Sequence, residues 1–297
     1  MLYILKSKRK LPPNAEKTIR VLKDKLKKRR VDSKVISLEN LEVFLDGNSA
    51  AMKINDWGPN KRSPVYFRIV EKYKNASYIF SKYLEIKKIP FIDNYHASTR
   101  ERNKLIQMFL LAINGINIPR TYYTPVYDTK KIRNAVRFLQ FPIVIKLTYK
   151  ERGEGVFLAR DIKKLQQMLE KNKEQEIILQ EYLDNDFDYR ILVLGHRTKL
   201  GETRTRTNKK EFRNNACKGA VERFFPAEEV PNDMKKISEQ SSRIMNIQVC
   251  GVDIIRSRKG KLHVIEVNFS PGFTLDEKMD ELNQTADYLK KWHEKKY

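Results

Sequence analysis

The chain has 297 residues, 40% of them hydrophobic, which is an ordinary globular composition that excludes a disordered protein and allows two domains or one large one. Its 60 Lys and Arg against 37 Asp and Glu give a net charge of +23, which attracts anions such as nucleotides, acidic peptides and RNA, unless it only keeps the protein soluble. Two cysteines and the absence of an apolar run of about 20 residues exclude a disulfide framework and a membrane helix, so a reducing cytoplasmic setting is expected.

The first 96 residues are predicted to form a small, doubly wound α/β domain. A helix is expected over residues 14–30, where Ile19, Leu22 and Leu26 recur at helical spacing. Strands are expected at 2–7, 32–38 and 64–70, and strand–helix alternation continues through 77–93. No G-x-G-x-x-G follows the first strand, so this domain is not predicted to bind a dinucleotide.

The remainder, residues 97–297, is predicted to contain two further α+β units, at about 97–184 and 185–297. The expected elements of the first are helices at 99–115, near 129–140 and near 161–173, with strands at 141–148, 155–160 and 176–183. The expected elements of the second are antiparallel strands at 189–195 and 198–205, a helix near 231–247, a hairpin at 249–268 and a last helix at 285–296.

The hairpin carries polar side chains within apolar strands. Glu266 and Asn268 are two residues apart, so they share one face, while Ile265, Val267 and Phe269 are expected to face a core. If residues 257–260 form the turn, Asp253 faces Val264 and lies one diagonal step from Glu266.

Asp253, Glu266 and Asn268 together offer only oxygen ligands and no His or Cys. Such a set suits one or two Mg²⁺ or Mn²⁺ ions that keep waters and phosphate oxygens as their other ligands. A solvated polar face with chance carboxylates is the alternative interpretation.

Lys146 lies within a β-branched strand, where an ammonium is costly unless it meets an anion. Gly153 and Gly155 follow, in a loop whose backbone amides could bind phosphates. The alternative is an edge-strand lysine that extends to water.

Two later segments add further nucleotide-binding candidates. The strand ending at Gln180–Leu183 can present backbone groups to an adenine edge, and a carboxylate in the acidic stretch that follows can hold ribose hydroxyls. In "EFRNNACKGA" (211–220), the guanidinium of Arg213 and the amide of Asn215 suit a transferring phosphoryl group.

The motifs Lys146, "GEG", "QEYL", "DYR", "EFRNN", "GVDII" and "IEVNFSPG" occur in the order found in ATP-grasp ligases. The chain most resembles the RimK type, which joins glutamate to the C-terminus of a ribosomal protein, over roughly residues 97–290. The resemblance implies an α/β ATP-grasp fold, with two α+β subdomains that clamp ATP, preceded by a small Rossmann-like domain.

The resemblance also implies a role for each candidate residue. It makes Asp253, Glu266 and Asn268 metal ligands, Lys104 and Lys146 phosphate contacts, Glu181, Tyr182 and Leu183 adenine contacts, Asp188 the ribose ligand, and Arg213 and Asn215 γ-phosphate contacts. Lys146 and Arg213 would neutralise charge during phosphoryl transfer, and the loop at 153–155 would close as a lid. Two departures from the family pattern are the charged "KERGEGV" and the "ACKGA" after "FRNN"; the second concerns the acceptor substrate more than the nucleotide site.

The expected activity is therefore that of a carboxylate–amine ligase that works through an acylphosphate, using ATP and a divalent metal ion. A peptide-tailoring or cofactor-glutamylating ligase, and a non-catalytic RNA- or ribosome-binding protein, are the alternatives. Neither substrate is identified by the sequence, although an amino acid and an acidic peptide or ribosomal protein are expected, and members of the family often form homo-oligomers.

Charge adds one hypothesis about the acceptor. Residues 1–95 hold 22 Lys and Arg against 10 Asp and Glu, a net charge of +12. The densest cluster, Lys25, Lys27, Lys28, Arg29 and Arg30, is expected to attract an anionic acceptor through many weak, salt-sensitive contacts.

Overall fold

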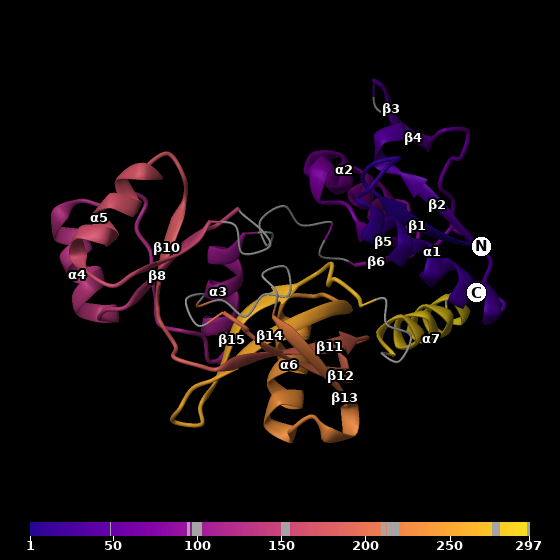
Figure 1. Cartoon of the computed structure of the whole chain (residues 1–297). Coiled ribbons are helices and arrows are strands. Elements are labelled where there is room, and N and C mark those ends of the chain that lie inside the picture. Colours follow the sequence, from indigo (N-terminus) through magenta and orange to yellow (C-terminus); the bar gives the residue numbers. More distant parts are fainter. Residues whose placement is uncertain are drawn as a thin grey trace.

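A computed structural model describes residues 1–47, 49–93, 96, 103–149, 155–208, 212, 220–274 and 280–295. Three sheets with their helices make up the molecule, together with one small two-stranded hairpin (Figure 1). Within these described ranges no helix is both long enough and apolar enough to cross a membrane.

The N-terminal sheet is parallel and has the strand order β2-β1-β5-β6. Its elements are β1 (Leu2–Lys6), α1 (Pro13–Lys28), β2 (Ser33–Ser37), the 3₁₀ turn η1 (Leu38–Asn40), β5 (Val65–Ile69), the 3₁₀ turn η2 (Glu71–Tyr73), α2 (Lys74–Ile86) and β6 (Phe91–Ile92). Ile19, Leu22 and Leu26 of α1 are buried, which confirms the predicted helix and its apolar face.

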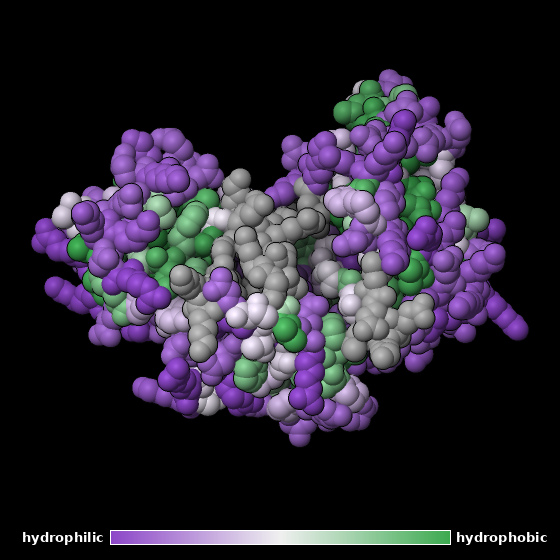
Figure 2. All heavy atoms as spheres, viewed as in Figure 1, coloured by the Kyte–Doolittle hydropathy of each residue, from purple (hydrophilic) through white to green (hydrophobic). Residues whose placement is uncertain are grey.

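An antiparallel hairpin, β3 (Leu41–Asp46) and β4 (Ser49–Ile54), follows β2 and precedes β5 along the chain. The sequence did not predict it. Leu41 pairs with Ile54 near the base, where Ile54 is buried, but Leu45 near the tip is 78% exposed. Figure 2 shows apolar side chains at the upper right, where Figure 1 places this hairpin. Val43, Phe44 and Leu45 are all exposed, so the outer part of this hairpin adds little to the core.

The second sheet has the order β7-β10-β8-β9 and is covered by two helices that meet its apolar side chains in one core. Its elements are β7 (Thr121–Tyr122), α4 (Thr129–Leu139), β8 (Ile143–Leu147), β9 (Val156–Ala159), α5 (Ile162–Lys171) and β10 (Ile177–Glu181). Asp128 and Asp161 cap α4 and α5 by accepting hydrogen bonds from backbone N–H groups of the first turn.

The third sheet is antiparallel, with the order β13-β12-β11-β14-β15. Its strands are β11 (Phe187–Leu194), β12 (Arg197–Thr205), β13 (Val221–Pro226), β14 (Val249–Arg256) and β15 (Leu262–Asn268). Helices α3 (Lys104–Ile113) and α6 (Asn232–Ile244) share a buried core with it, and η5 (Ala227–Glu229) precedes α6. The strand β13 was not predicted.

The edge strand β15 is closed off by polar groups rather than left open. The amide of Gln107 on α3 accepts from the Val267 N–H (2.7 Å) and donates to its carbonyl (3.0 Å). Val264 donates its N–H to the Asn117 carbonyl (2.9 Å), so the strand that carries Glu266 is held against α3.

The last helix, α7 (Glu281–Glu294), packs against α1 of the N-terminal unit rather than on the second sheet. The side chains of α1, β1 and α7 share one apolar core with the ends of β11 and β12. The domain boundaries at 96/97 and 184/185 remain predictions.

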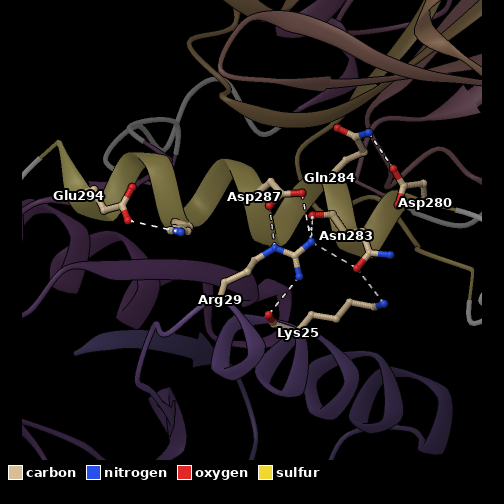
Figure 3. Close-up of polar contacts among 8 residues, drawn as sticks. Lys25, Arg29, Asp280, Asn283, Gln284, Asp287 and Glu294 are labelled. Carbon is tan, nitrogen blue, oxygen red and sulfur yellow. Dashed lines mark hydrogen bonds and ion pairs between the residues drawn. The ribbon is translucent and has the colours of Figure 1, made fainter.

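Polar contacts fasten the same two helices (Figure 3). Arg29 donates to both carboxylate oxygens of Asp287 (2.7 and 3.1 Å), and Lys25 donates to Asn283 (3.0 Å). Two of the five cations expected to attract an anionic acceptor, Lys25 and Arg29, thus bind α7, and the attraction of an acceptor by the cluster stays a prediction.

Candidate functional site

One cleft lies between the second and third sheets and has an empty volume of about 880 Å³, part of it open to solvent. Its lining is formed by Lys104, Pro119, Val144, Lys146, Val156, Gln180, Glu181, Tyr182, Leu183, Asn185, Asp188, Arg204, Phe212, Asp253, Ile255, Ile265 and Glu266. Eight of the sequence-predicted site residues are in this list, and they come from separate parts of the chain that only the fold brings together.

The β14–β15 hairpin places two of these carboxylates directly opposite each other. Asp253 pairs with Glu266 across the ladder, whereas Val264 pairs with Ile254. The predicted register, with Asp253 opposite Val264, is wrong for two reasons. The turn includes Lys261, because the Ser257 N–H donates a hydrogen bond to the Lys261 carbonyl (2.9 Å). A β-bulge at Ile265 then shifts the strand register by one more residue.

The bulge also changes which apolar side chains face the core. Val264 and Val267 are fully buried against α3 and α6, but Ile265 lines the cleft, so its predicted core position is wrong. Ile265, Ile255 and Val144 give the cleft an apolar section beside its charged section. A flat heteroaromatic base fits such a combination of apolar walls and a few polar groups.

Asp253 is held by two arginines from neighbouring strands. Arg190 on β11 donates to both of its carboxylate oxygens (2.8 and 2.9 Å), and Arg204 on β12 lies 3.2 Å from Oδ2. Burial raises the pKa of Asp253, but the charges and hydrogen bonds of Arg190 and Arg204 outweigh it and leave the pKa lowered, so the group stays a carboxylate.

Gly251 makes room for this arrangement. A Cβ atom at Gly251 would lie 3.1 Å from Cδ and 3.2 Å from Nε of Arg190, so a side chain there would push the guanidinium away from Asp253. Asn268, opposite Gly251, donates to Asp253 Oδ2 (3.1 Å) and is not among the residues that line the cleft.

Lys146 lies on β8, which has β10 on one side and β9 on the other. The alternative of an edge-strand lysine is therefore wrong, because this strand is interior. Burial lowers the pKa of Lys146 to about 8, with nearby Glu266 acting in the opposite direction. Lys104 lies 3.5 Å from Glu266 Oε1, so two ammonium groups and this carboxylate meet in the cleft.

The end of β10 forms another wall of the cleft through Gln180, Glu181, Tyr182 and Leu183. The Glu181 carboxylate accepts from the Arg120 backbone N–H and from Arg120 Nε, both at 2.8 Å, which fixes the strand end. Burial raises the pKa of Glu181, but its hydrogen bonds with Arg120 outweigh this and leave the pKa lowered.

Asp188, the expected ribose ligand, lines the cleft but is only 4% exposed. Its carboxylate accepts from Arg204 Nε at 2.7 Å. One of its oxygens therefore already has a strong partner, and its contact with ribose remains a prediction.

Three predicted residues, Gly153, Arg213 and Asn215, lie outside the described residues. Gly155 is described and has φ +72°, with a would-be Cβ 2.9 Å from Leu147. That conformation and close approach require glycine at the start of β9, whereas a phosphate contact at Gly155 remains a prediction.

The sequence did not indicate a role for Arg204, and Arg190 appeared only as the last residue of the motif "DYR". The missed signal was the spacing of two: Asp188 and Arg190 share one face of β11, and Glu202 and Arg204 share the matching face of β12. The sequence alone could not show that these opposite charges face each other, because that requires knowledge of how β11 and β12 pair.

The oxygen donors of the cleft are suited to a divalent cation. No group of three or more His, Cys, Asp or Glu side chains suited to a metal ion occurs among the described residues. The cleft instead offers Asp253 and Glu266 in direct cross-strand register, and among the described residues Oδ1 of Asp253 accepts one hydrogen bond, from Arg190. Two carboxylates fit Mg²⁺, which commonly binds through one or two of them and completes its shell with water and phosphate oxygens.

Comparison with known proteins adds a family to this geometry. A family model described as the RimK-like ATP-grasp domain matches residues 101–291. A probable alpha-L-glutamate ligase of Maridesulfovibrio salexigens is 32% identical over 206 residues, which cover 66% of this chain. The alignment covers 65% of that relative, a little less than two thirds of its length.

Solved structures extend the likeness to nearly the whole chain. The ATP-grasp ligase PsnB, complexed with a phosphomimetic variant of its minimal precursor, Mg and ADP, gives a TM-score of 0.74 at 16% identity, over 98% of both chains. D-alanyl-alanine synthetase A of Vibrio cholerae gives 0.71 at 12% identity, over 99% of this chain and 97% of the other. At these identities the likeness shows a shared fold.

Proposed function

The chain belongs to the RimK-like ATP-grasp family and has the ATP-grasp fold, and on that premise we propose that it is an ATP-dependent carboxylate–amine ligase. It would join glutamate or a similar amino acid to the C-terminus of a protein or peptide. One observation carries the proposal: Lys104, Lys146, Asp253 and Glu266 meet in one cleft that also has an apolar section.

In the proposed binding mode, the adenine base occupies the apolar section beside the end of β10. The triphosphate then extends toward Lys146 and Lys104, whose ammonium groups supply positive charge. A divalent ion, Mg²⁺ or Mn²⁺, would be held by Asp253 and Glu266, with Asn268 as the third proposed ligand. When bound, it would supply further positive charge to the phosphates.

The proposed reaction has two steps. An oxygen of the substrate carboxylate attacks the γ-phosphorus, the bond to the bridging oxygen breaks, and ADP leaves an acylphosphate behind. The amine nitrogen then attacks the acyl carbon and loses a proton, and inorganic phosphate leaves with the electrons of the broken C–O bond. Lys146 and Arg213 would neutralise charge in the first step, which depends mainly on positioning.

Arg190 and Arg204 are assigned a positioning role in this scheme. They keep Asp253 ionised and fix both of its oxygens, so the carboxylate presents its remaining acceptor site in one orientation. The loop that contains Gly153 would close over the acylphosphate and exclude water.

A peptide-tailoring ligase is the second candidate, favoured by one observation. PsnB, whose structure contains a variant of its minimal precursor, matches this chain over 98% of its length. A cofactor-glutamylating ligase remains a further alternative. A non-catalytic RNA-binding role is less well supported, because Lys146, Asp253 and Glu266 are all present in the cleft.

The experiment is ADP release measured with Mg²⁺ across single amino acids paired with acidic, basic and neutral peptides. An ATP-grasp ligase releases ADP only with a matching pair and forms an amide that mass spectrometry detects. A ribosomal-protein acceptor and a homo-oligomer are parts of the proposal that rest on family resemblance. An acidic acceptor rests on the net charge, and a cytoplasmic location rests on the small number of cysteines. ADP release without any new amide would contradict the ligase assignment.

A further inference from the structure

The solvent face of α1 carries an unusual density of positive charge. Residues 17–30 hold eight Lys and Arg and a single acid, Asp24. Five of these cations are exposed at intervals that place them on one side of the helix: Lys17, Arg20, Lys23, Lys27 and Lys28. Within the described part of the chain, none of the five side chains forms an ion pair.

The helix that carries this basic stripe is packed against the core and held by polar contacts. Its opposite face buries Ile19, Leu22 and Leu26, each 2% exposed or less. Lys25 and Arg29 are used for the contacts with α7 (Figure 3), so they orient the helix and leave the stripe to solvent. Charges fixed on a rigid helix lose less entropy on binding than charges on a mobile segment.

The stripe is separate from the cleft. No residue of α1 lines the cleft, and Figure 1 places α1 beside α7, on the side of the molecule away from the β7-β10-β8-β9 sheet. Its charge is therefore not explained by nucleotide binding, and it is independent of the proposed ligase activity.

We propose that this face of α1 binds the phosphate backbone of a nucleic acid. From Lys17 to Lys28 the stripe extends about 17 Å, at about 1.5 Å per residue. A duplex presents one negative charge per about 1.7 Å along its axis, so the stripe spans about ten phosphates. A protein with a pI near 9.8 and cations aligned along one helix has the electrostatic features of such a surface.

The shape of the surface favours nucleic acid over other polyanions. The stripe lies on the convex outer side of a helix, whereas peptides are held in grooves or along free strand edges. The apolar residues of α1 are buried in the core, so the helix has no apolar face to insert into a lipid surface. Phosphate backbones need neither a groove nor an apolar face, because long cationic side chains reach them directly.

The test compares two triple variants of equal charge change. The stripe variant is Arg20→Gln, Lys23→Gln, Lys27→Gln. The control is Lys130→Gln, Arg133→Gln, Arg137→Gln, which removes three exposed cations of α4 at similar spacing. Binding of a labelled oligouridylate and of a labelled duplex RNA is measured by fluorescence anisotropy at several salt concentrations.

The stripe variant is expected to bind both RNAs about tenfold more weakly at low salt. The slope of the logarithm of the binding constant against the logarithm of the salt concentration should become less steep by about 2, because each lost phosphate contact removes about 0.7 to 0.9 from its magnitude. The control should stay within about twofold of the unmodified protein. ADP release should be unchanged in both variants, which separates this proposal from the ligase proposal.

An equal loss of RNA affinity in the two variants would show that binding depends on the net charge of the whole protein and not on the stripe, and would overturn the proposal. Unchanged binding by the stripe variant would also overturn it. Polyglutamate or anionic vesicles that displace the RNA at matched charge concentration would assign the stripe to an acidic peptide or a lipid surface instead.

Discussion

Replacing Lys146 by alanine tests the centre of the candidate site. Its ammonium is one of the two expected to meet the nucleotide phosphates, and it lies on an interior strand near Glu266. A charge-assisted hydrogen bond contributes about 1.5–3 kcal/mol, which corresponds to a roughly 10- to 150-fold loss of nucleotide affinity. The fold should persist, because the substitution removes a charge that burial already disfavours.

The pKa of Lys146 supplies a second, independent measurement. In the free protein, burial lowers this pKa from 10.5 to about 8, and a bound phosphate would raise it again. Above pH 8 the free protein therefore loses the Lys146 proton, and nucleotide binding must take up a proton again. Nucleotide affinity is consequently highest below pH 8 and falls as the pH rises above 8. Between pH 7 and 9 the protonated fraction drops from about 0.9 to about 0.1, which predicts a loss of about tenfold.

The assay is isothermal titration calorimetry with a non-hydrolysable ATP analogue and Mg²⁺ between pH 6.5 and 9.5. Lys146→Ala should bind weakly at every pH and should lack the decline above pH 8. Lys163→Ala, an exposed lysine on α5, is the control and should follow the unmodified protein. Affinity within twofold of the unmodified protein, or an unmodified curve that stays flat through pH 8, would refute the assignment.

Three further outcomes are expected. Glu266→Gln should keep the fold but abolish Mg²⁺-dependent ADP release, because it removes one of two cross-strand carboxylates; full activity at saturating Mg²⁺ would exclude Glu266 as a ligand. Gly251→Ala should destabilise the protein by about 1–3 kcal/mol in a denaturant titration and lower ADP release, because its Cβ displaces Arg190; no change in either would contradict the packing argument. Arg29→Ala should lower the melting temperature by only about 2 °C, since its ion pair with Asp287 is partly exposed; an equally large loss in the Asp287→Ala background would contradict the assignment to this pair.

Local sequence pattern was enough to predict most of the helices and strands. The helical spacing of Ile19, Leu22 and Leu26 predicted α1, and the period of two in residues 249–268 predicted a hairpin with carboxylates on one face. These features depend on neighbours a few residues apart along the chain, so the sequence contains the information directly. The order of the motifs also indicated the family, which the match over residues 101–291 supports.

Position within the sheets could not be predicted in the same way. The register of Asp253 depends on a bulge at Ile265, and a single inserted residue reverses which side chains face the core. Lys146 was as consistent with an edge strand as with an interior one until β9 and β10 were placed on either side of β8.

The sequence by itself determined which residue types were present for the chemistry: the ammonium of Lys146 and the carboxylates of Asp253 and Glu266. Tertiary structure alone decided what surrounds them. Arg190 and Arg204 reach Asp253 from strands about 50 to 60 positions away along the chain, and Arg29 meets Asp287 across 258 positions. Such partners are set by strand order and helix packing, which place distant segments side by side, and no local spacing in the sequence encodes that placement.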